Sequence, residues 1–298
     1  MGRGEPGGAG AVTRPGAAVA LPFLWLLLLV AAPVAILAAI ALSAPAEGIP
    51  PFAPPLAWAD GLPRWRGSMA SLGVLLEDPL YREAALRALG VAAATGGLCL
   101  LLGYPMALGI ARARPERRPL LLVLLLLPFW TGFLLRLSAW IGLLRDEGWI
   151  NGVLRGLGVI EQPLPLLYSD LALMLGMVHA YLPFAVLPLV ATLTRLDPAL
   201  EEAAGALGAR PAVAFWTVTL PLSLPGALAG FLLVFIPAAG EFVIPELLGP
   251  PEAQLIGRVL WSEFFQNRDW PLAATLALAL LAVLVVPILL FQRLEAQR

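Results

Sequence analysis

Three ionisable side chains lie inside long apolar stretches of the sequence: Arg136, His179 and Glu241. A charge at the centre of a membrane costs about 2.5–3.5 kcal/mol on insertion scales, so each one needs a structural or functional reason. Arg136 and Glu241 fall at similar depths along their stretches and could form a buried ion pair. Alternatively, Glu241 faces a polar path across the membrane, where a carboxylate provides a transient site for a cation. The sequence leaves both interpretations open.

Aromatic side chains accompany these charges. Phe129 and Trp130 precede Arg136, and Phe242 follows Glu241. The three rings could form a gate or a cation–π surface along the same path, although aromatic residues in membrane helices more often serve packing. We therefore take Phe129, Trp130, Arg136, Glu241 and Phe242 together as a candidate translocation path.

The residues needed for catalysis are missing. The chain contains no Lys, so it has no phosphate-binding loop of the form G-x-x-x-x-G-K-[ST] and cannot hydrolyse ATP by that chemistry. His179 is the only histidine and Cys99 the only cysteine, too few for a metal site, and both are expected to be packing residues. With a net charge of −1, the chain also lacks the basic excess of a nucleic-acid-binding protein. We expect neither an enzyme nor a cofactor in this chain.

The elements that hold these residues must be membrane helices. Hydrophobic residues make up 60% of the chain and charged residues only 13%, about half of the roughly 25% typical of soluble domains. Six stretches approach or exceed the roughly 20 apolar residues that a spanning helix requires. They are Leu21–Leu42, Arg87–Ile110, Pro119–Leu144, Leu171–Leu193, Leu222–Leu248 and Pro271–Phe291. The fold class is therefore all-α and integral to the membrane, with one transmembrane domain over residues 21–298.

Basic residues in short loops fix the expected orientation. Four arginines cluster between the second and third stretches, at positions 112, 114, 117 and 118, and such clusters stay in the cytoplasm. Both termini, including a tail of residues 1–20, are then cytoplasmic. Residues 43–83 form an outside loop, Pro-rich at its start and expected to be extended there. Asp78-Pro79 is a good helix start, so the second helix is expected to begin outside the membrane.

The inside loop of residues 195–221 carries a strong helix signal. Asp197 is suited to the N-cap, Pro198 to the first helical position and Glu201 to a capping box, while Gly208 suits the C-terminal stop. A helix over Pro198–Leu207 is therefore expected below the membrane. Its exposed face is made of small residues, which let the backbone of another protein approach closely.

This loop resembles a known signature. Glu202-Ala203-Ala204 is followed after three residues by Gly208, after nine more by Val218, and after one more by Leu220-Pro221. The pattern is similar to the EAA signature of ABC importer permeases, which usually have Ile at the position of Val218. In that family the loop is the coupling helix that seats in a groove of a separate ATPase. The resemblance assigns ATPase docking to Glu201, Glu202, Ala203, Ala204, Gly208, Leu220 and Pro221.

Other segments, from about residue 70 to the end, resemble the permeases of spermidine and putrescine importers, the PotB/PotH-like family. They are residues 128–136, 139–140, 148–151, 181–184, 237–249, 256–257 and 269–271. One departure is Pro250, where the family commonly has a second Gly. The resemblance implies a type I (MetI-like) permease of the bacterial inner membrane. It also implies an ABC ATPase dimer that binds ATP and Mg, a second permease subunit that is a different chain, and a periplasmic or lipoprotein substrate-binding protein.

The sequence can be compared with three alternatives to a polyamine permease. A permease for another class of solute fits the same motifs, because the binding protein sets most of the specificity. A secondary transporter or channel would need ion-coupling charges and usually internal repeats, and neither is convincing here. A membrane enzyme would need several convergent catalytic groups at one interface, and one histidine is too few.

Overall fold

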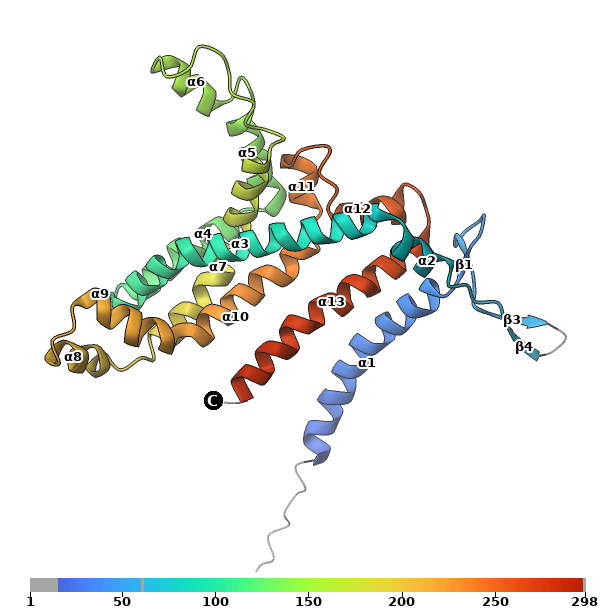
Figure 1. Cartoon of the computed structure of the whole chain (residues 1–298), viewed down its shortest axis with the longest axis horizontal. Coiled ribbons are helices and arrows are strands. Elements are labelled where there is room, and N and C mark those ends of the chain that lie inside the picture. Colours follow the sequence, from blue (N-terminus) through green and yellow to red (C-terminus); the bar gives the residue numbers. More distant parts are fainter. Residues whose placement is uncertain (1–15, 60–61, 297–298) are drawn as a thin grey trace, which may run out of the picture.

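A computed structural model describes residues 16–59 and 62–296 of the chain, which fold into a bundle of helices with two small hairpins on one side (Figure 1). The helices up to the middle of the chain are α1 Gly16–Ala41, α2 Ala70–Glu77, α3 Pro79–Arg112, α4 Arg118–Trp130, α5 Phe133–Leu144 and α6 Trp149–Gly156. The later helices are α7 Asp170–Leu193, α8 Pro198–Ala206, α9 Pro211–Ala214, the π turn η1 Phe215–Thr219, α10 Leu220–Ala239, α11 Val243–Leu248, α12 Ile256–Phe265 and α13 Trp270–Ala296.

The number of spans agrees with the sequence. In the described part of the chain, five helices are long and apolar enough to cross a membrane, and the bent pair of α4 with α5 and α6 makes a sixth. The five are Pro22–Ala41, Pro79–Arg112, Asp170–Leu193, Pro211–Ala239 and Trp270–Arg293. The prediction of six spans is confirmed with the broken pair counted as one. The expected tail of residues 1–20 lies mostly outside the described residues.

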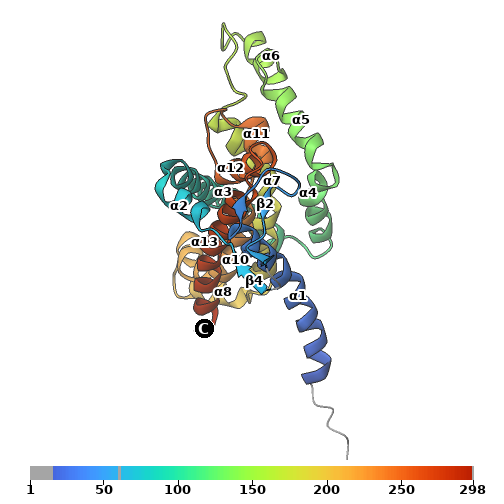
Figure 2. The same ribbon diagram turned by 90° about the vertical axis from the view of Figure 1, so that its right-hand side faces the viewer.

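The third span is not the single helix that was expected over residues 119–144. It breaks after Trp130, and the two parts meet at an angle of 82°. Thr131 and Gly132 have extended backbone, and the Thr131 hydroxyl donates a 2.7 Å hydrogen bond to the carbonyl of Pro128 at the helix end. Pro128 also removes one donor from this last turn. The break sends α5 and α6 away from the bundle as a protruding arm (Figure 2).

The fifth span was predicted to run without interruption to Leu248, which is also wrong. Helix α10 ends at Ala239, and the short helix α11 starts only at Val243. Pro237 weakens the last turn because it lacks an N–H, and Gly240 caps it. Glu241 therefore lies in a non-helical link and not on a helix face.

Helices α3, α7 and α10 pack together as the centre of the bundle. Small residues make this contact close: a Cβ added at Gly230 of α10 would lie 2.7 Å from the carbonyl oxygen of Ala185 in α7. Such small-residue contacts are typical of helix pairs in membranes. A second hydrophobic cluster joins the ends of α3, α4, α7 and α10, and includes Ala107, Leu125, Leu189 and Ala227. The bundle is thus packed up to the end at which α8 lies.

The Pro-rich start of the loop of residues 43–83 is extended, as expected, and its extended segments are paired. It forms two antiparallel hairpins, β1 Ala44–Pro45 with β2 Phe52–Ala53 and β3 Leu56–Ala59 with β4 Leu62–Trp65, and α2 follows them. The predicted helix start is confirmed, since the Asp78 carboxylate accepts the amide hydrogen of Leu80 at the beginning of α3. The C-terminal end of α13 and the first turns of α1 lie toward the same side of the molecule as α8 (Figure 1). The hairpins lie on the opposite side.

Candidate functional site: the loop between α7 and α10

The loop that carries the signature holds the predicted helix. Helix α8 covers Pro198–Ala206, one residue shorter than expected. The Asp197 carboxylate caps it by accepting the amide hydrogen of Ala199 at 2.9 Å. Gly208 has φ +88°, a left-handed conformation that favours glycine, and turns the chain back. None of the α8 residues is buried within the chain, so the whole helix projects from the bundle.

The return from α8 to the membrane is one helical segment with a wide turn. Helix α9, the π turn and α10 form a continuous run over Pro211–Ala239. In the π turn, the amide of Leu220 bonds the carbonyl of Phe215, five residues back. Pro221 cannot bond the carbonyl of Thr217, and its ring crowds that carbonyl, which disturbs the regular pattern at this point. Single π turns inside α-helices are frequent at functional sites.

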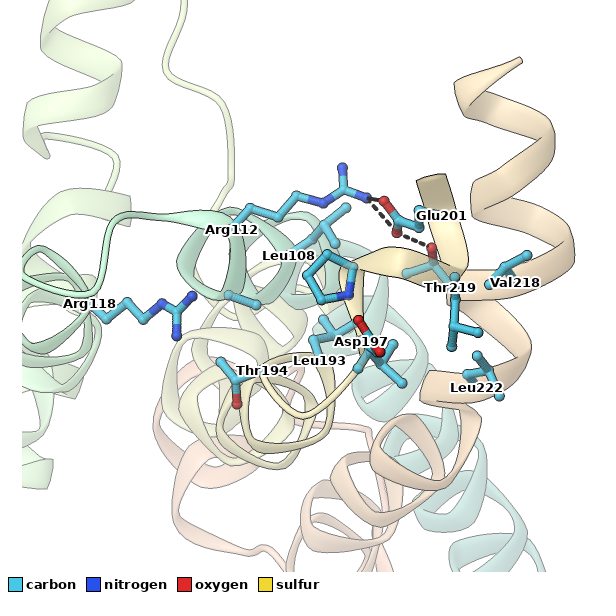
Figure 3. Close-up of a pocket in the computed structure, with 14 residues that line it drawn as sticks. Leu108, Arg112, Arg118, Leu193, Thr194, Asp197, Glu201, Val218, Thr219 and Leu222 are labelled. Atoms are coloured by element: carbon cyan, nitrogen blue, oxygen red, sulfur yellow. Dashed lines mark hydrogen bonds and ion pairs between the residues drawn. The ribbon is translucent and has the colours of Figure 1, made fainter. Parts of the chain in front are cut away.

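Glu201 links α8 to two other elements, as Figure 3 shows. The Arg112 guanidinium, at the end of α3, donates through Nη2 to both carboxylate oxygens of Glu201 at 2.8 Å. The buried hydroxyl of Thr219, in the π turn, donates to Glu201 Oε1. The predicted capping box is therefore wrong, because Glu201 is the fourth helical residue, one beyond the position that such a box requires, and its side chain turns away from its own helix start. We call Arg112, Glu201 and Thr219 the Glu201 clamp.

A cavity of about 340 Å³ opens behind α8, between the ends of α3 and α7 and the π turn (Figure 3). Its wall combines apolar side chains such as Leu108 and Leu222 with the charges of Arg112, Arg118 and Glu201. The Thr219 hydroxyl and the Arg112 guanidinium hold the pKa of Glu201 below its ordinary value, although partial burial acts in the opposite direction. Glu201 is therefore an ionised group at neutral pH.

The remaining residues assigned to docking divide into two groups. Glu202, Ala203 and Gly208 are exposed, while Ala204 is half-buried. Leu220 and Pro221 belong instead to the first turn of α10, where Leu220 is half-buried and Pro221 exposed. The exposed face of α8 and the start of α10 are thus parts of one structure, and the Glu201 clamp joins them.

Glu241 occupies the break between α10 and α11. Its Oε2 accepts a 2.7 Å hydrogen bond from the Tyr181 hydroxyl of α7, and its Oε1 accepts the amide hydrogens of Phe242 at 3.0 Å and Val243 at 2.8 Å. Helix α12 approaches this break closely, since a Cβ at Gly257 would lie 2.5 Å from the carbonyl oxygen of Gly240. The Glu241 carboxylate thus has partners in α7 and at the start of α11, and the residue is half-buried.

Arg136 does not pair with Glu241, so the buried ion pair is not formed. Its guanidinium carbon lies 4.8 Å from the ring centre of Phe129 and 5.9 Å from that of Phe133. Its Nε and Nη1 are buried and have no hydrogen-bond partner among the described residues. The bend after Trp130 explains the difference, because the assumption of equal depth required an unbroken third span.

The predicted aromatic gate is also not one cluster. Phe129 packs edge-on against Phe184, with ring centres 5.2 Å apart, and Phe184 neighbours Tyr181 at 6.2 Å. Phe242 stacks instead on Trp261 of α12 at 6.2 Å, and Trp130 is 76% exposed. The rings of Phe129, Phe184 and Tyr181 therefore connect Arg136 to Glu241 through aromatic contacts, and Trp130 and Phe242 lie outside this connection.

Several polar partners were missed from sequence. Arg112 was read only as part of a basic cluster, and Thr219 only as a spacer within the signature. Tyr104 of α3 was not considered, yet its hydroxyl lies 2.6 Å from Ser223 Oγ of α10 and its ring packs edge-on against Phe215 at 5.5 Å. The sequence predicts that the second span ends, and the fourth span leads into α8, on the same side of the membrane, so Arg112 is expected near α8. The ion pair of Arg112 with Glu201 depends on three-dimensional packing that the sequence pattern does not give.

Comparison with known proteins identifies the family of the chain. Residues 100–298 match the family described as the binding-protein-dependent transport system inner membrane component. The chain is 40% identical over 218 residues to the spermidine/putrescine transport system permease protein PotB of Escherichia coli strain K12, covering 73% of this chain and 79% of the relative. It is 35% identical over 215 residues to the molybdenum transport system permease protein ModB of Mycobacterium bovis, covering 71% and 78%.

A solved structure shares the fold. A chain of the bacterial alginate ABC transporter, determined in complex with a periplasmic protein that holds an alginate pentasaccharide, superposes with a TM-score of 0.64. The match covers 94% of this chain and 93% of that one, at 17% sequence identity. At 17% identity the similarity supports the fold of type I importer permeases, but it does not indicate the substrate.

Proposed function

The chain belongs to the binding-protein-dependent transport system inner membrane components, and on that basis we propose that the solute it carries is a polyamine. Membership makes it a permease subunit of an ABC importer in the bacterial inner membrane, not an enzyme. The observation that carries the choice of solute is the 40% identity to PotB over 73% of the chain. A carboxylate half-buried at a helix break, Glu241, is consistent with a cationic solute.

Docking of an ATPase is assigned to the loop of residues 195–221. Helix α8 of this loop has no buried residue and projects from the bundle, and its outer face consists of small side chains, to which Glu202 adds a negative charge. The chain itself has no phosphate-binding loop, so the driving force must come through this contact. Two ATPases and a second permease, a different chain, complete the complex that we propose.

The orientation follows from the same argument. Because an ATPase needs cytoplasmic ATP, the side that carries α8 is cytoplasmic in this proposal. The first turns of α1 and the end of α13 lie toward that side (Figure 1), which supports cytoplasmic termini. The arginines at 112, 114, 117 and 118 run from the last residue of α3 to the first residue of α4 on the same side, as the positive-inside rule expects. The hairpins of residues 44–65 then face the periplasm, where a substrate-binding protein delivers the solute.

Transport proceeds by alternating access in this proposal. Closure of the ATPases on ATP moves α8, and the packed helix ends behind it follow. The breaks after Trp130 and after Ala239 divide the third and fifth spans into segments that can turn separately. Their aromatic contacts, through Phe129, Phe184 and Tyr181, lie between those breaks.

Uptake of radiolabelled spermidine tests the solute. Cells that lack their own polyamine importers would express the full set of subunits, with and without this chain. We expect saturable uptake that needs ATP and the chain, and that unlabelled putrescine reduces. Absence of spermidine and putrescine uptake, with the complex present in the membrane at normal amounts, would reject the polyamine assignment.

A small anion is the second candidate. The buried Nε and Nη1 of Arg136 have no partner among the described residues, and an oxyanion would satisfy both. The 35% identity to ModB points in the same direction. Uptake of labelled molybdate by the same cells separates the two candidates, because a path selective for polyamine cations would not carry it.

A further inference from the structure

The Glu201 clamp ties the projecting helix to two separate parts of the bundle. Arg112 is the last residue of α3, directly after Ile110 and Ala111, which are buried in the hydrophobic cluster at this end of the bundle. Thr219 is 2% exposed and lies in the π turn that leads into α10. A single carboxylate, that of Glu201, contacts both.

Apolar packing cannot replace this contact. Helix α8 has no buried residue, and a cavity of about 340 Å³ lies behind it. Helix α8 does touch α9 and the π turn, which are its own continuation along the chain. Among the described residues, the hydrogen bonds that link α8 to α3 are the two from Arg112 Nη2 to Glu201, which lies 89 residues later in the sequence.

The π turn and α3 are also joined independently of Glu201. The Tyr104 hydroxyl lies 2.6 Å from Ser223 Oγ, and its ring packs against Phe215 at 5.5 Å. These contacts hold the start of α10 against α3. The contacts of Tyr104 do not include α8. A movement of α8 is therefore transmitted to α3 chiefly through Glu201.

We propose that Glu201 is a positioning residue that transmits movement of α8 to α3 and α10, while docking itself is left to the exposed face of α8. This inference rests on the proposed docking of an ATPase at that face. The carboxylate is well suited to the task because it accepts from a guanidinium and a hydroxyl at once, so α8 cannot shift without displacing one of them. The Arg112 and Glu201 side chains are 55% and 38% exposed, so loss of the pair should leave the chain folded.

The test uses the complete complex, purified with its ATPase and reconstituted in vesicles with the binding protein. Two rates are measured, spermidine uptake and ATP hydrolysis, and their ratio reports coupling. For Glu201→Gln and Arg112→Gln we expect the ATPase to remain bound and hydrolysis to continue, while spermidine taken up per ATP falls about fivefold. Thr219→Val should lower the ratio, and Thr219→Ser should keep it.

Exchanging the two charges distinguishes a role in coupling from a role in folding alone, because only the first predicts that the coupling ratio recovers in the double variant. Arg112→Glu combined with Glu201→Arg should couple better than either single change, because the ion pair is restored with reversed sign. Arg114→Gln, an exposed arginine just beyond α3, is the matched control and should leave the ratio unchanged.

Three results would overturn the inference. Unchanged coupling in Glu201→Gln would show that α8 does not act through the clamp, and a swap no better than the single variants would show that the charges are not paired in function. Loss of the ATPase from Glu201→Gln would assign Glu201 to docking. A wild-type chain that binds no ATPase would reject the proposed function, and this inference would fall with it.

Discussion

The Tyr181 hydroxyl donates a 2.7 Å hydrogen bond to Glu241 Oε2 across the interface between α7 and the break that follows α10. The same carboxylate caps the start of α11 through the amides of Phe242 and Val243. Glu241 therefore holds three elements in one arrangement. If Glu241 lines the proposed path, a cation that binds its carboxylate competes with the Tyr181 hydroxyl for Oε2.

Replacement of Glu241 tests its part in transport. Glu241→Gln keeps the size and the cap but removes the charge, and we expect spermidine uptake to fall about tenfold, which corresponds to about 1.4 kcal/mol. Tyr181→Phe keeps the charge of Glu241 and removes only the hydrogen bond to Glu241 Oε2, so this variant should reduce uptake less than Glu241→Gln. Phe129→Leu serves as a comparison for loss of a neighbouring ring. Normal uptake by Glu241→Gln, at normal protein amounts, would reduce Glu241 to a structural cap.

Packing of α10 against α7 gives a prediction on stability. Gly230→Ala places a Cβ 2.7 Å from the Ala185 carbonyl oxygen, a contact that only a shift of backbone can relieve. We expect the free energy of unfolding to fall by about 1–3 kcal/mol. Gly97→Ala in α3 is the matched control, because no atom lies within 4 Å of the added carbon there.

The two glycine variants are compared by thermal unfolding of the complex in one detergent. Gly97→Ala should be neutral or slightly stabilising, since alanine is the better helix former by about 1 kcal/mol. Equal unfolding temperatures for the two variants would mean that α7 and α10 are not in tight contact at Gly230.

The pH dependence of the Glu201 clamp follows from the direction in which the pKa of Glu201 is shifted. The pKa of Glu201 in the folded chain lies below its ordinary value of 4.5, because Thr219 and Arg112 stabilise the carboxylate. Its contribution to stability is then fully present above the ordinary pKa and is lost as the pH falls through the lower folded value. Coupling should therefore be constant from about pH 6 to about pH 8, where the carboxylate is ionised.

Measurement of uptake per ATP across this range checks the expectation. Glu201→Gln should give the same lowered ratio at each pH, since it has nothing to titrate at this position. A wild-type ratio that decreases from pH 8 to pH 6, with no such decrease in Glu201→Gln, would mean that the clamp loses its charge in this range and that the environment of Glu201 is different.

Much of this architecture could be predicted from sequence. The lengths of the apolar stretches predicted the number of spans. The ends of α8 were predicted to within one residue from Asp197, Pro198 and Gly208, because capping residues act on the backbone next to them. The breaks could not be predicted in the same way. Hydropathy continues across Thr131 and Gly240, and only the three-dimensional packing decides whether a proline such as Pro128 or Pro237 kinks a helix or ends it.

The partners of the charged residues depended on those breaks. Arg136 and Glu241 were expected at equal depth on two straight helices, and the 82° bend in the third span removed that relation. Glu201 was read from its local position as part of a capping box, whereas its partners come from residues 89 positions before and 18 positions after it. Local rules predicted the helix, and long-range contacts decided what its side chain does.

Copurification shows whether the exposed face of α8 docks an ATPase, as we propose. The chain would be isolated in mild detergent, and the amount of ATPase subunit recovered with it measured. We expect the ATPase to be recovered with the wild-type chain. Glu252→Lys, which changes an exposed acid between α11 and α12, is the matched control and should retain it. Glu202→Lys should reduce the recovered ATPase about tenfold, which corresponds to about 1.4 kcal/mol. Gly208→Trp should act in the same direction, because its φ of +88° disfavours any side chain. Full recovery of a coupled ATPase with Glu202→Lys and Gly208→Trp would contradict the account.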